Sequence, residues 1–480
     1  MSRCTPNRQL SALLLEADWS AADLARAVNA LGTAQGLVLR YDRTSVAHWL
    51  TGSRPRAPVP DLAAQALSRR SGRPVTAQET GLTQFPRAAA VRPGLAEEGE
   101  PLRRLGALCR GESDPAQRAE LARTVYTVTT APSARPGPAQ PPARVAARRR
   151  AAHPSDVQGL TEMSGVFVSL AQTHGGGHAR TALAAYLGDD VVPLLNASGT
   201  ESWHRELLTG GAQLTHVLAV MTDDAGHHGL ARRYFRTALS LAREAGSRAV
   251  RAVTLRVMSG QALRLGYLHH AAELAQAAVG VDAAGLDVQA FVLVQRALVR
   301  ATQRRVREAL ADLGAAEGAH ERASGAPGPF TAYPRSGLDY QRALTFRALG
   351  RTEDALAALH DSVRHRSGGE RRGDALTQAR IAEMLLEQGR LEEACARWHA
   401  FLDVYPRLHS VQADQALGRL TRTLRSFARH PHAAGVQERA RGVLRPARLA
   451  NPEPAGRGAR LSDPAHSTYS TYSTRPTRMA

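Results

Sequence analysis

Histidines next to glycines are the side chains in this sequence whose spacing most suggests metal or anion chemistry. His174 and His178 flank three glycines, and the doublets His227-His228 and His269-His270 each follow a glycine closely. A zinc site needs further Cys, His or carboxylate ligands at suitable spacing, and none accompanies His174 and His178. Because no Gly-x-Ser-x-Gly motif is present, an oxyanion hole of glycine N–H groups would have no nucleophile to serve. We therefore interpret residues 174–178 as a flexible turn between helices and predict no metal site.

The basic residues exclude several enzyme mechanisms, because none of them is lysine. The chain has 62 basic residues, all arginine, against 43 acidic ones, for a net charge of +19 over 480 residues. P-loops, protein kinases and Schiff-base enzymes all need a lysine amine. Cys4, Cys109 and Cys395 stand far apart, which suits a reducing compartment and provides neither a disulfide framework nor a zinc cluster. We predict a protein that is not an enzyme and has no catalytic residues and no cofactor.

Composition divides the chain into four parts. Residues 1–81 form a small unit, 82–155 a basic, Pro-rich linker with short helices, 156–445 a body of nearly balanced charge, and 446–480 a basic tail that we expect to be disordered. The stretch APSARPGPAQPP at 131–142 predicts an extended spacer. Basic ends on a balanced body are typical of proteins that bind a polyanion, and nucleic acid is the first candidate. No apolar run near the start is long enough for a signal peptide or a membrane span, so we expect a cytoplasmic protein without membrane contact.

Residues 8–81 show the periodicity of four short helices. In the third, Val46, Trp49 and Leu50 fall at i, i+3 and i+4 and define a buried side, while Thr44 is a suitable N-cap and Gly52 a suitable stop. The opposite side is then cationic, small and hydrogen-bonding, as is typical of a helix that enters the DNA major groove. The predicted contacts with double-stranded DNA are base contacts from Arg43, Thr44, Ser45 and His48, and phosphate contacts from Arg40, Arg54 and Arg56.

These residues resemble the Cro-like (XRE-type) helix-turn-helix of bacterial regulators. The segment Ser20 to Ala25 (SAADLA) stands where that family opens its second helix, and Thr44 to Gly52 (TSVAHWLTG) stands where it has the recognition helix and its glycine stop. Between them, Ala30 to Arg43 replace the tight turn that is usual in the family. The alternative is a helical module that docks on the body of the chain or on a partner and does not touch DNA.

An internal repeat runs through residues 160–440. Each copy has a glycine that ends one helix, an alanine five residues later, and then a large and a small residue four and seven residues after the alanine. The copies are Gly226/Ala231/Phe235/Ala238, Gly266/Ala271/Ala275/Ala278, Gly350/Ala355/Leu359/Ser362 and Gly389/Ala394/Trp398/Phe401, with weaker ones at Arg304/Ala309/Leu313/Ala316 and Gly177/Ala182/Tyr186. The spacing resembles tetratricopeptide repeats, in which small residues let two antiparallel helices approach closely. The alternative is a helical solenoid without that ancestry.

Either kind of array presents a long concave surface, which we predict to bind a peptide or protein. Polar residues on the outward side of the first helices would suit an acidic or carboxylate-bearing ligand. These candidates are Arg256, Gln261, Arg264, Arg296, Arg300, Arg342, Arg347 and Arg380. For each arginine the alternative is a solvated helix face.

The sequence therefore predicts an all-α protein, a small helix-turn-helix bundle followed by a tetratricopeptide-type α-solenoid. This order of parts resembles actinomycete regulatory proteins with tetratricopeptide repeats, a group that includes negative regulators of differentiation and antibiotic production. The resemblance implies a cytoplasmic transcriptional regulator whose repeats sense a partner and alter the access of the helix-turn-helix to promoters. A homodimer is expected because one such unit covers only a half-site. The alternative is a tetratricopeptide adaptor or scaffold that never contacts DNA.

Overall fold

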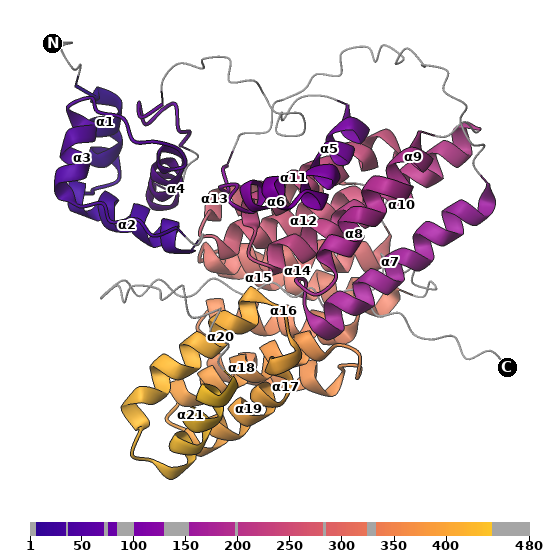
Figure 1. The fold of residues 1–480 in the computed structure, drawn as a ribbon. Helices are drawn as coiled ribbons and strands as arrows, with labels where there is room; N and C mark the ends of the chain where they lie inside the picture. Colours follow the sequence, from indigo (N-terminus) through magenta and orange to yellow (C-terminus); the bar gives the residue numbers. More distant parts are fainter. Residues whose placement is uncertain are drawn as a thin grey trace.

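The computed structural model describes residues 6–34, 37–71, 75–83, 100–128, 153–196, 200–281, 285–323 and 333–443. These residues contain helices and loops but no strand. A small N-terminal bundle is followed by a helical solenoid, which confirms the predicted fold class (Figure 1). The predicted spacer at 131–142, the predicted tail at 446–480 and Cys4 lie outside the described residues.

The N-terminal bundle (residues 8–83) is built from the apolar sides that the sequence pattern indicated. Its helices are α1 (Arg8–Glu16), α2 (Ala21–Ala34), α3 (Arg43–Leu50) and α4 (Val59–Ser71). Leu10, Leu24 and Val46 are completely buried in its core. Ser20 caps α2: its N–H donates to the Asp23 carboxylate at 2.9 Å, and its hydroxyl accepts from the Asp23 N–H at 3.3 Å. The periodicity of apolar residues therefore predicted the four helices of the N-terminal bundle correctly.

Two short helices of the predicted linker pack against the solenoid. They are α5 (Pro101–Ser113) and α6 (Pro115–Ala122), followed by the extended residues 124–128. Glu112 of α5 forms a buried ion pair with Arg180, and its carboxylate also accepts from the Tyr234 hydroxyl at 3.4 Å. Cys109 is buried beside this pair, and burial raises the pKa of its thiol. This part of the linker is therefore integrated into the solenoid core.

The solenoid consists of antiparallel helix pairs preceded by the long helix α7. The entry segment comprises α7 (Pro154–His174), α8 (Arg180–Tyr186), the π-turn η1 (Leu187–Val191) and α9 (Val192–Leu195). The pairs are α10 (Glu201–Asp224) with α11 (His228–Glu244), α12 (Arg248–Arg264) with α13 (Leu268–Val279), α14 (Leu286–Thr302) with α15 (Val306–Arg322), α16 (Arg335–Ala348) with α17 (Thr352–Arg364), α18 (Arg371–Glu387) with α19 (Leu391–Val404), and α20 (Val411–Thr423) with α21 (Pro431–Val443). The single turns η2 (Tyr405–Arg407) and η3 (Leu424–Phe427) connect the last helices.

The same turn recurs inside five of these pairs, as the repeat predicted. At the first, Gly226 has φ +90°, its N–H donates to the Asp223 carbonyl at 3.0 Å, and the His227 N–H donates to the Thr222 carbonyl at 3.1 Å. The equivalent turns stand at Gly266, Arg304, Gly350 and Gly389, all with positive φ. The alanines that follow are completely buried, at positions 231, 271, 309, 355 and 394. The weak copy at Arg304 is therefore confirmed, whereas the copy at Gly177 is wrong, because Ala182 is exposed.

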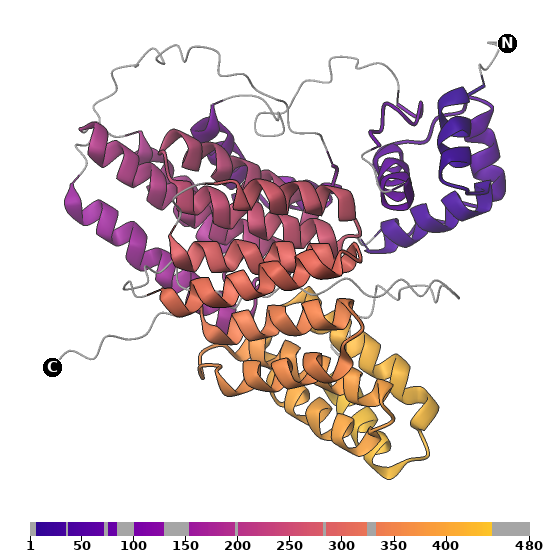
Figure 2. The ribbon, with the colours of Figure 1, turned by 180° about the vertical axis from the view of Figure 1, so that it is seen from behind.

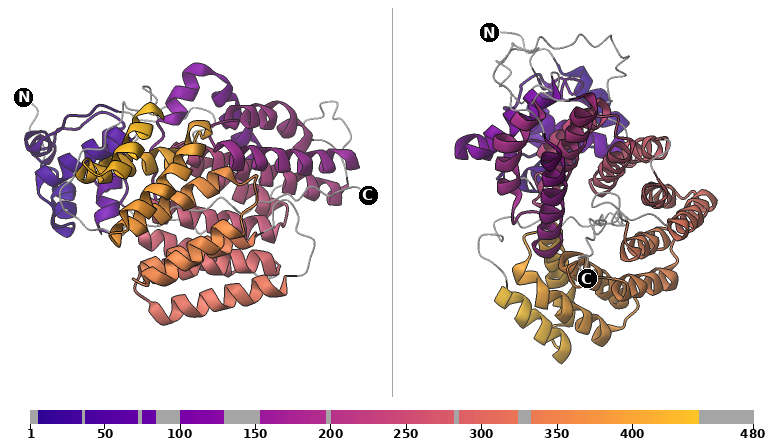
Figure 3. Two further views of the ribbon diagram at one scale, coloured as in Figure 1. Left: turned by 90° about the horizontal axis from the view of Figure 1, so that it is seen from below. Right: turned by 90° about the vertical axis from the view of Figure 1, so that its right-hand side faces the viewer.

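The array curves round until its last pairs meet its first helix (Figure 3, right). At this closure the His409 N–H donates to the His174 carbonyl at 2.7 Å, and the Gly177 N–H donates to the His409 carbonyl at 2.9 Å. The Asp224 carboxylate, at the end of α10, bonds to three other segments: the α7–α8 turn, the start of α18 and the residue before α20. It accepts from the Gly176 N–H at 2.8 Å, the Arg372 guanidinium at 2.6 and 2.8 Å, and the Ser410 hydroxyl at 2.7 Å. We call residues 174–178, Asp224, Arg372 and 408–411 the clasp.

The clasp gives the histidine–glycine stretch a structural role. A Cβ on Gly176 would collide with the Met221 carbonyl, and one on Gly175 would lie 2.7 Å from the His409 carbonyl oxygen. Only glycine allows the α7–α8 turn to approach these backbones so closely. The prediction of a flexible turn is therefore wrong in its flexibility, because hydrogen bonds to two distant segments hold residues 174–178.

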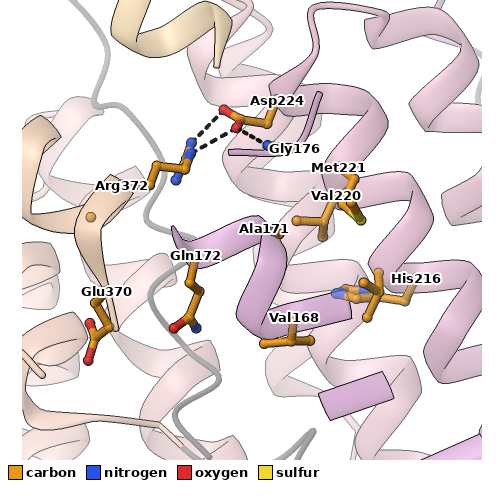
Figure 4. A pocket seen from close by; sticks show the side chains of 12 residues that line it. Val168, Ala171, Gln172, Gly176, His216, Val220, Met221, Asp224, Glu370 and Arg372 are labelled. Atoms are coloured by element: carbon orange, nitrogen blue, oxygen red, sulfur yellow. Dashed lines mark hydrogen bonds and ion pairs between the residues drawn. The ribbon is translucent and has the colours of Figure 1, made fainter. Parts of the chain in front are cut away.

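A small cavity lies beside the clasp between α7, α10 and α18. Figure 4 shows Arg372 reaching Asp224 on one side and the apolar Val168, Val220 and Met221 on the other. Its volume is about 30 Å³, which is room for about one water molecule.

Candidate nucleic-acid interface

Helix α3 begins with a capping box that the sequence prediction placed two residues too late. Asp42 is the N-cap: its carboxylate accepts from the Ser45 N–H at 2.8 Å and from the Ser45 hydroxyl at 2.7 Å. These hydrogen bonds lower the pKa of Asp42. Thr44, the predicted cap, is the second helical residue and is exposed. Gly52, with φ +108°, ends the helix as predicted.

The inward side of α3 is the predicted one. Val46 is completely buried, Trp49 is 4 % exposed, and the Trp49 ring meets Tyr41 edge-on with 5.1 Å between ring centroids. Asn29 of α2 fixes the approach to the helix, since its amide donates to the Tyr41 carbonyl at 2.7 Å and accepts from the Tyr41 N–H at 2.9 Å. Asn29 was not among the predicted residues. The only feature of the sequence that marks it is that a polar residue stands on the inner side of α2. Because α2 extends to Ala34, the connection is residues 35–42, shorter than the predicted Ala30–Arg43.

The outer face of α3, by which we mean Arg43, Thr44, Ala47 and His48, is exposed. Ser45 is half-buried, and its hydroxyl is bonded to Asp42, so it is turned toward the helix start. The predicted phosphate contacts, Arg40, Arg54 and Arg56, are also exposed and stand directly before and after the helix. Among the described residues, the side chains of these three arginines, of Arg43 and of His48 form no ion pair and no hydrogen bond. The structure thus gathers six of the seven predicted residues around one exposed helix.

The solenoid does not cover this face. In Figures 1 and 2, α1 and α3 lie on the side of the bundle away from the solenoid, and α4 lies on the near side. The junction is made by Arg69 of α4, whose guanidinium lies 5.8 Å from the Tyr267 ring centroid. Val125 packs on the bundle core, while Tyr126 packs on Tyr267 with 5.2 Å between ring centroids. The bundle is therefore attached to the solenoid through the surface opposite α3.

Three of the eight predicted partner-binding residues are buried, which corrects the prediction that they face outward. Arg256, Gln261 and Arg380 are buried; Arg256 lies over the Phe291 ring at 4.0 Å. The other five are partly exposed, and their guanidinium groups pair with acids on other helices. Arg342 also lines a surface cavity between α15, α16 and α17. The pairs formed by the candidates are Gln261 and Arg264 with Asp223, Arg296 and Arg300 with Asp312, Arg342 with Glu317 and Asp361, Arg347 with Glu387, and Arg380 with Glu383.

These arginines pair with acids inside the array because a charge between packed helices must be neutralised locally. Removing a guanidinium from water costs several kcal/mol unless a carboxylate compensates. The compensating acids lie on other helices, except Glu383, which lies on α18 three residues after Arg380. Asp223, at 0 % side-chain exposure, accepts from Gln261 at 2.6 Å and from His228 at 2.7 Å. The adjacent acids Asp223 and Asp224 therefore bond to side chains from several other segments of the array. They were not among the predicted residues, although two adjacent acids just before the Ala225-Gly226 turn were a visible signal.

The histidine doublets have no metal-binding arrangement. Burial lowers the pKa of His227 to about 4, and His228 bonds Asp223. His269 and His270 both lie within reach of Glu273. No group of three or more His, Cys, Asp or Glu in the described ranges is placed to hold a metal ion.

The comparisons with known proteins concern the N-terminal bundle. The sequence model of the SP15 N-terminal domain matches residues 10–83, a segment that begins within α1 and ends after α4. A search of curated proteins finds no match to the chain. None of the helices in the described part of the chain is both long enough and apolar enough to span a membrane.

Proposed function

We propose that this protein is a DNA-binding transcriptional regulator that inserts α3 into the major groove of double-stranded DNA. One observation carries the proposal: the cations around α3 are exposed and without acidic partners among the described residues, whereas the candidate arginines of the solenoid lie against internal groups. An exposed cluster of uncompensated guanidinium groups is the electrostatic signature of a phosphate-binding surface.

The chemistry of the outer face fits base recognition. Arg43, at the first helical position, is able to bond the O6 and N7 atoms of a guanine, and Thr44 and His48, one turn apart, present hydrogen-bonding groups beside it. Ala47 lies between them and permits close approach to the base edges. Arg40, Arg54 and Arg56 bind flanking phosphates. Ser45 holds the helix start through Asp42, so we assign it a positioning role.

The resemblance in the order of parts favours a cytoplasmic regulator of development or secondary metabolism, acting as a homodimer. The solenoid binds a peptide or protein partner, and of the eight predicted residues the buried Arg256, Gln261 and Arg380 are not available to it. A change in the curvature of the solenoid would be transmitted to the N-terminal bundle through the contact between Arg69 and Tyr267, and would move the bundle. The competing function is an adaptor that never contacts DNA.

The test is selection of duplexes from a random pool by the full-length chain. We expect an enriched sequence, and we expect Arg43→Ala/His48→Ala to weaken binding to it by at least about 5- to 150-fold, because the bidentate Arg43–guanine contact alone contributes about 1–3 kcal/mol. The control, His269→Ala/Arg305→Ala, removes the same residue types from the exposed solenoid surface and should not change binding. An adaptor would enrich no sequence, and both variants would retain all its protein partners.

A further inference from the structure

Three histidine side chains lie in a row across the closure of the array. The His174 and His178 rings have 4.5 Å between their centroids, and the His178 and His409 rings have 5.6 Å. We call these three side chains the histidine cluster. The backbones of His174 and His409 also take part in the hydrogen bonds that join the α7–α8 turn to residues 408–411. The cluster therefore spans the same joint as the backbone bonds of the clasp.

The ordinary explanation is a group of polar side chains at a solvated turn, and His178 is indeed exposed. His174 and His409, however, are half-buried. Neutral imidazole rings pack on one another at this spacing, whereas imidazolium rings repel. Burial, together with the neighbouring His178 and Arg371, lowers the pKa of His174. The closed arrangement therefore favours the uncharged form of the cluster.

The carboxylates on the helices around the clasp are already engaged by arginines. The pairs are Glu112 with Arg180, Asp223 with Arg264, Asp224 with Arg372, and Glu370 with Arg366. Along the chain from His409, Arg407 is exposed, and Asp414 accepts from the Tyr405 hydroxyl at 2.9 Å. None of the four paired carboxylates is free to compensate a protonated histidine cluster, and Arg371 of α18 adds positive charge beside it.

We propose that the clasp is an acid-sensitive closure, in which protonation of the histidine cluster weakens the joint between the α7–α8 turn and residues 408–411 and shifts the array toward an open form. The repelling rings belong to the residues that bridge the joint, so their charge acts directly on the two backbone hydrogen bonds. The inference does not depend on DNA binding.

The direction of the pH dependence follows from linkage. A histidine whose pKa is lower in the closed array than in the open one stabilises the closed form above the ordinary histidine pKa of about 6.5. That contribution is lost as the pH falls below this value, because the open form then binds protons more readily. The closure should therefore be strongest near neutral pH and weaken in acid.

The experiment measures hydrogen exchange of the Gly177 and His409 amides in the full-length chain at about pH 7.5 and about pH 5.0, with a chelator present to remove metal ions. Protection is taken relative to the intrinsic exchange rate at each pH. We expect protection of both amides to fall by about sevenfold or more, the change that follows if one histidine titrates at a pKa lower by about one in the closed array. In His174→Gln/His178→Gln/His409→Gln, the fall should be less than about twofold, because no imidazole of the cluster remains to be protonated.

The matched control is His204→Gln/His269→Gln/His432→Gln, which removes three histidines from other helices and should keep the wild-type fall. If the cluster variant falls as much as the wild type, another group such as Asp224 causes the pH dependence and the proposal is wrong. Equal protection of the wild type at the two pH values would overturn it as well.

A second variant, His178→Gln, replaces only the exposed ring of the cluster, so it disturbs no buried side chain. It should keep the wild-type protection at about pH 7.5 and show a smaller fall at about pH 5.0, because the charge between His174 and His409 is gone. A wild-type fall in this variant would contradict repulsion within the cluster. An unfolding midpoint equal to that of the wild type at the higher pH shows that each variant is folded.

Discussion

Breaking the clasp should open the closed solenoid by a measurable amount. In Asp224→Asn the side chain keeps its shape but loses its charge, and Arg372, at 4 % side-chain exposure, remains buried without its counter-ion. Removing one member of a buried ion pair costs about 3–5 kcal/mol. The two segments joined by Asp224, at Gly176 and Ser410, then lose a charged acceptor at the same time.

The assay is hydrogen exchange of the backbone amides of Gly177 and His409, which bridge the closure. A loss of about 3–5 kcal/mol corresponds to a fall in protection of about 150- to 5,000-fold. Asp354→Asn is the matched control, because its partner Arg351 is about half exposed and such surface pairs contribute at most about 1 kcal/mol. A fall of less than about tenfold in both amides would refute the idea that Asp224 closes the array, since tenfold is only about 1.4 kcal/mol.

Three further predictions follow from burial and packing. Gly176→Ala should lower the protection of the Gly177 and His409 amides from hydrogen exchange, because the new Cβ collides with the Met221 carbonyl. Gly435→Ala, at an open helical position, should instead raise the free energy of unfolding by about 0.5–1 kcal/mol. The same effect from both variants would contradict this difference. Trp49→Ala should destabilise the N-terminal bundle by about 3–5 kcal/mol, measured by amide exchange in α3, and a change below about 1 kcal/mol would count against the packing described. Burial lowers the pKa of His216 to about 3, below the unfolded value of about 6.5. The contribution of His216 to the free energy of unfolding is therefore present above about pH 6.5 and decreases by about 1.4 kcal/mol per pH unit as the pH falls toward 3. Urea unfolding should show this dependence on pH, and His216→Gln should lack it.

Local periodicity predicted those parts of the structure that depend on neighbours along the chain. The buried side of α3, the glycine stop at Gly52 and the alanine five residues after each repeat turn all follow from spacing within one helix or one turn. The cap was misplaced because Thr44 and Asp42 are both good N-caps, and only the backbone position of the first turn distinguishes them.

Pairing between distant segments could not be predicted in the same way. Arg372 lies 148 residues from Asp224, and Arg264 lies 41 residues from Asp223. An arginine on a helix has the same local pattern whether it faces water or the next helix of a stack. The direction of the solenoid arginines therefore depended on the curvature of the array, which a single repeat does not specify.

The most direct test of the central claim is to map crosslinked DNA sites of the chain across the genome of its host, for the wild type and for Arg43→Ala/His48→Ala. The account predicts discrete sites that share a short sequence in the wild type, and loss of those sites in the variant at equal protein abundance. A diffuse distribution in the wild type, or identical sites in both, would contradict the claim that the outer face of α3 reads DNA.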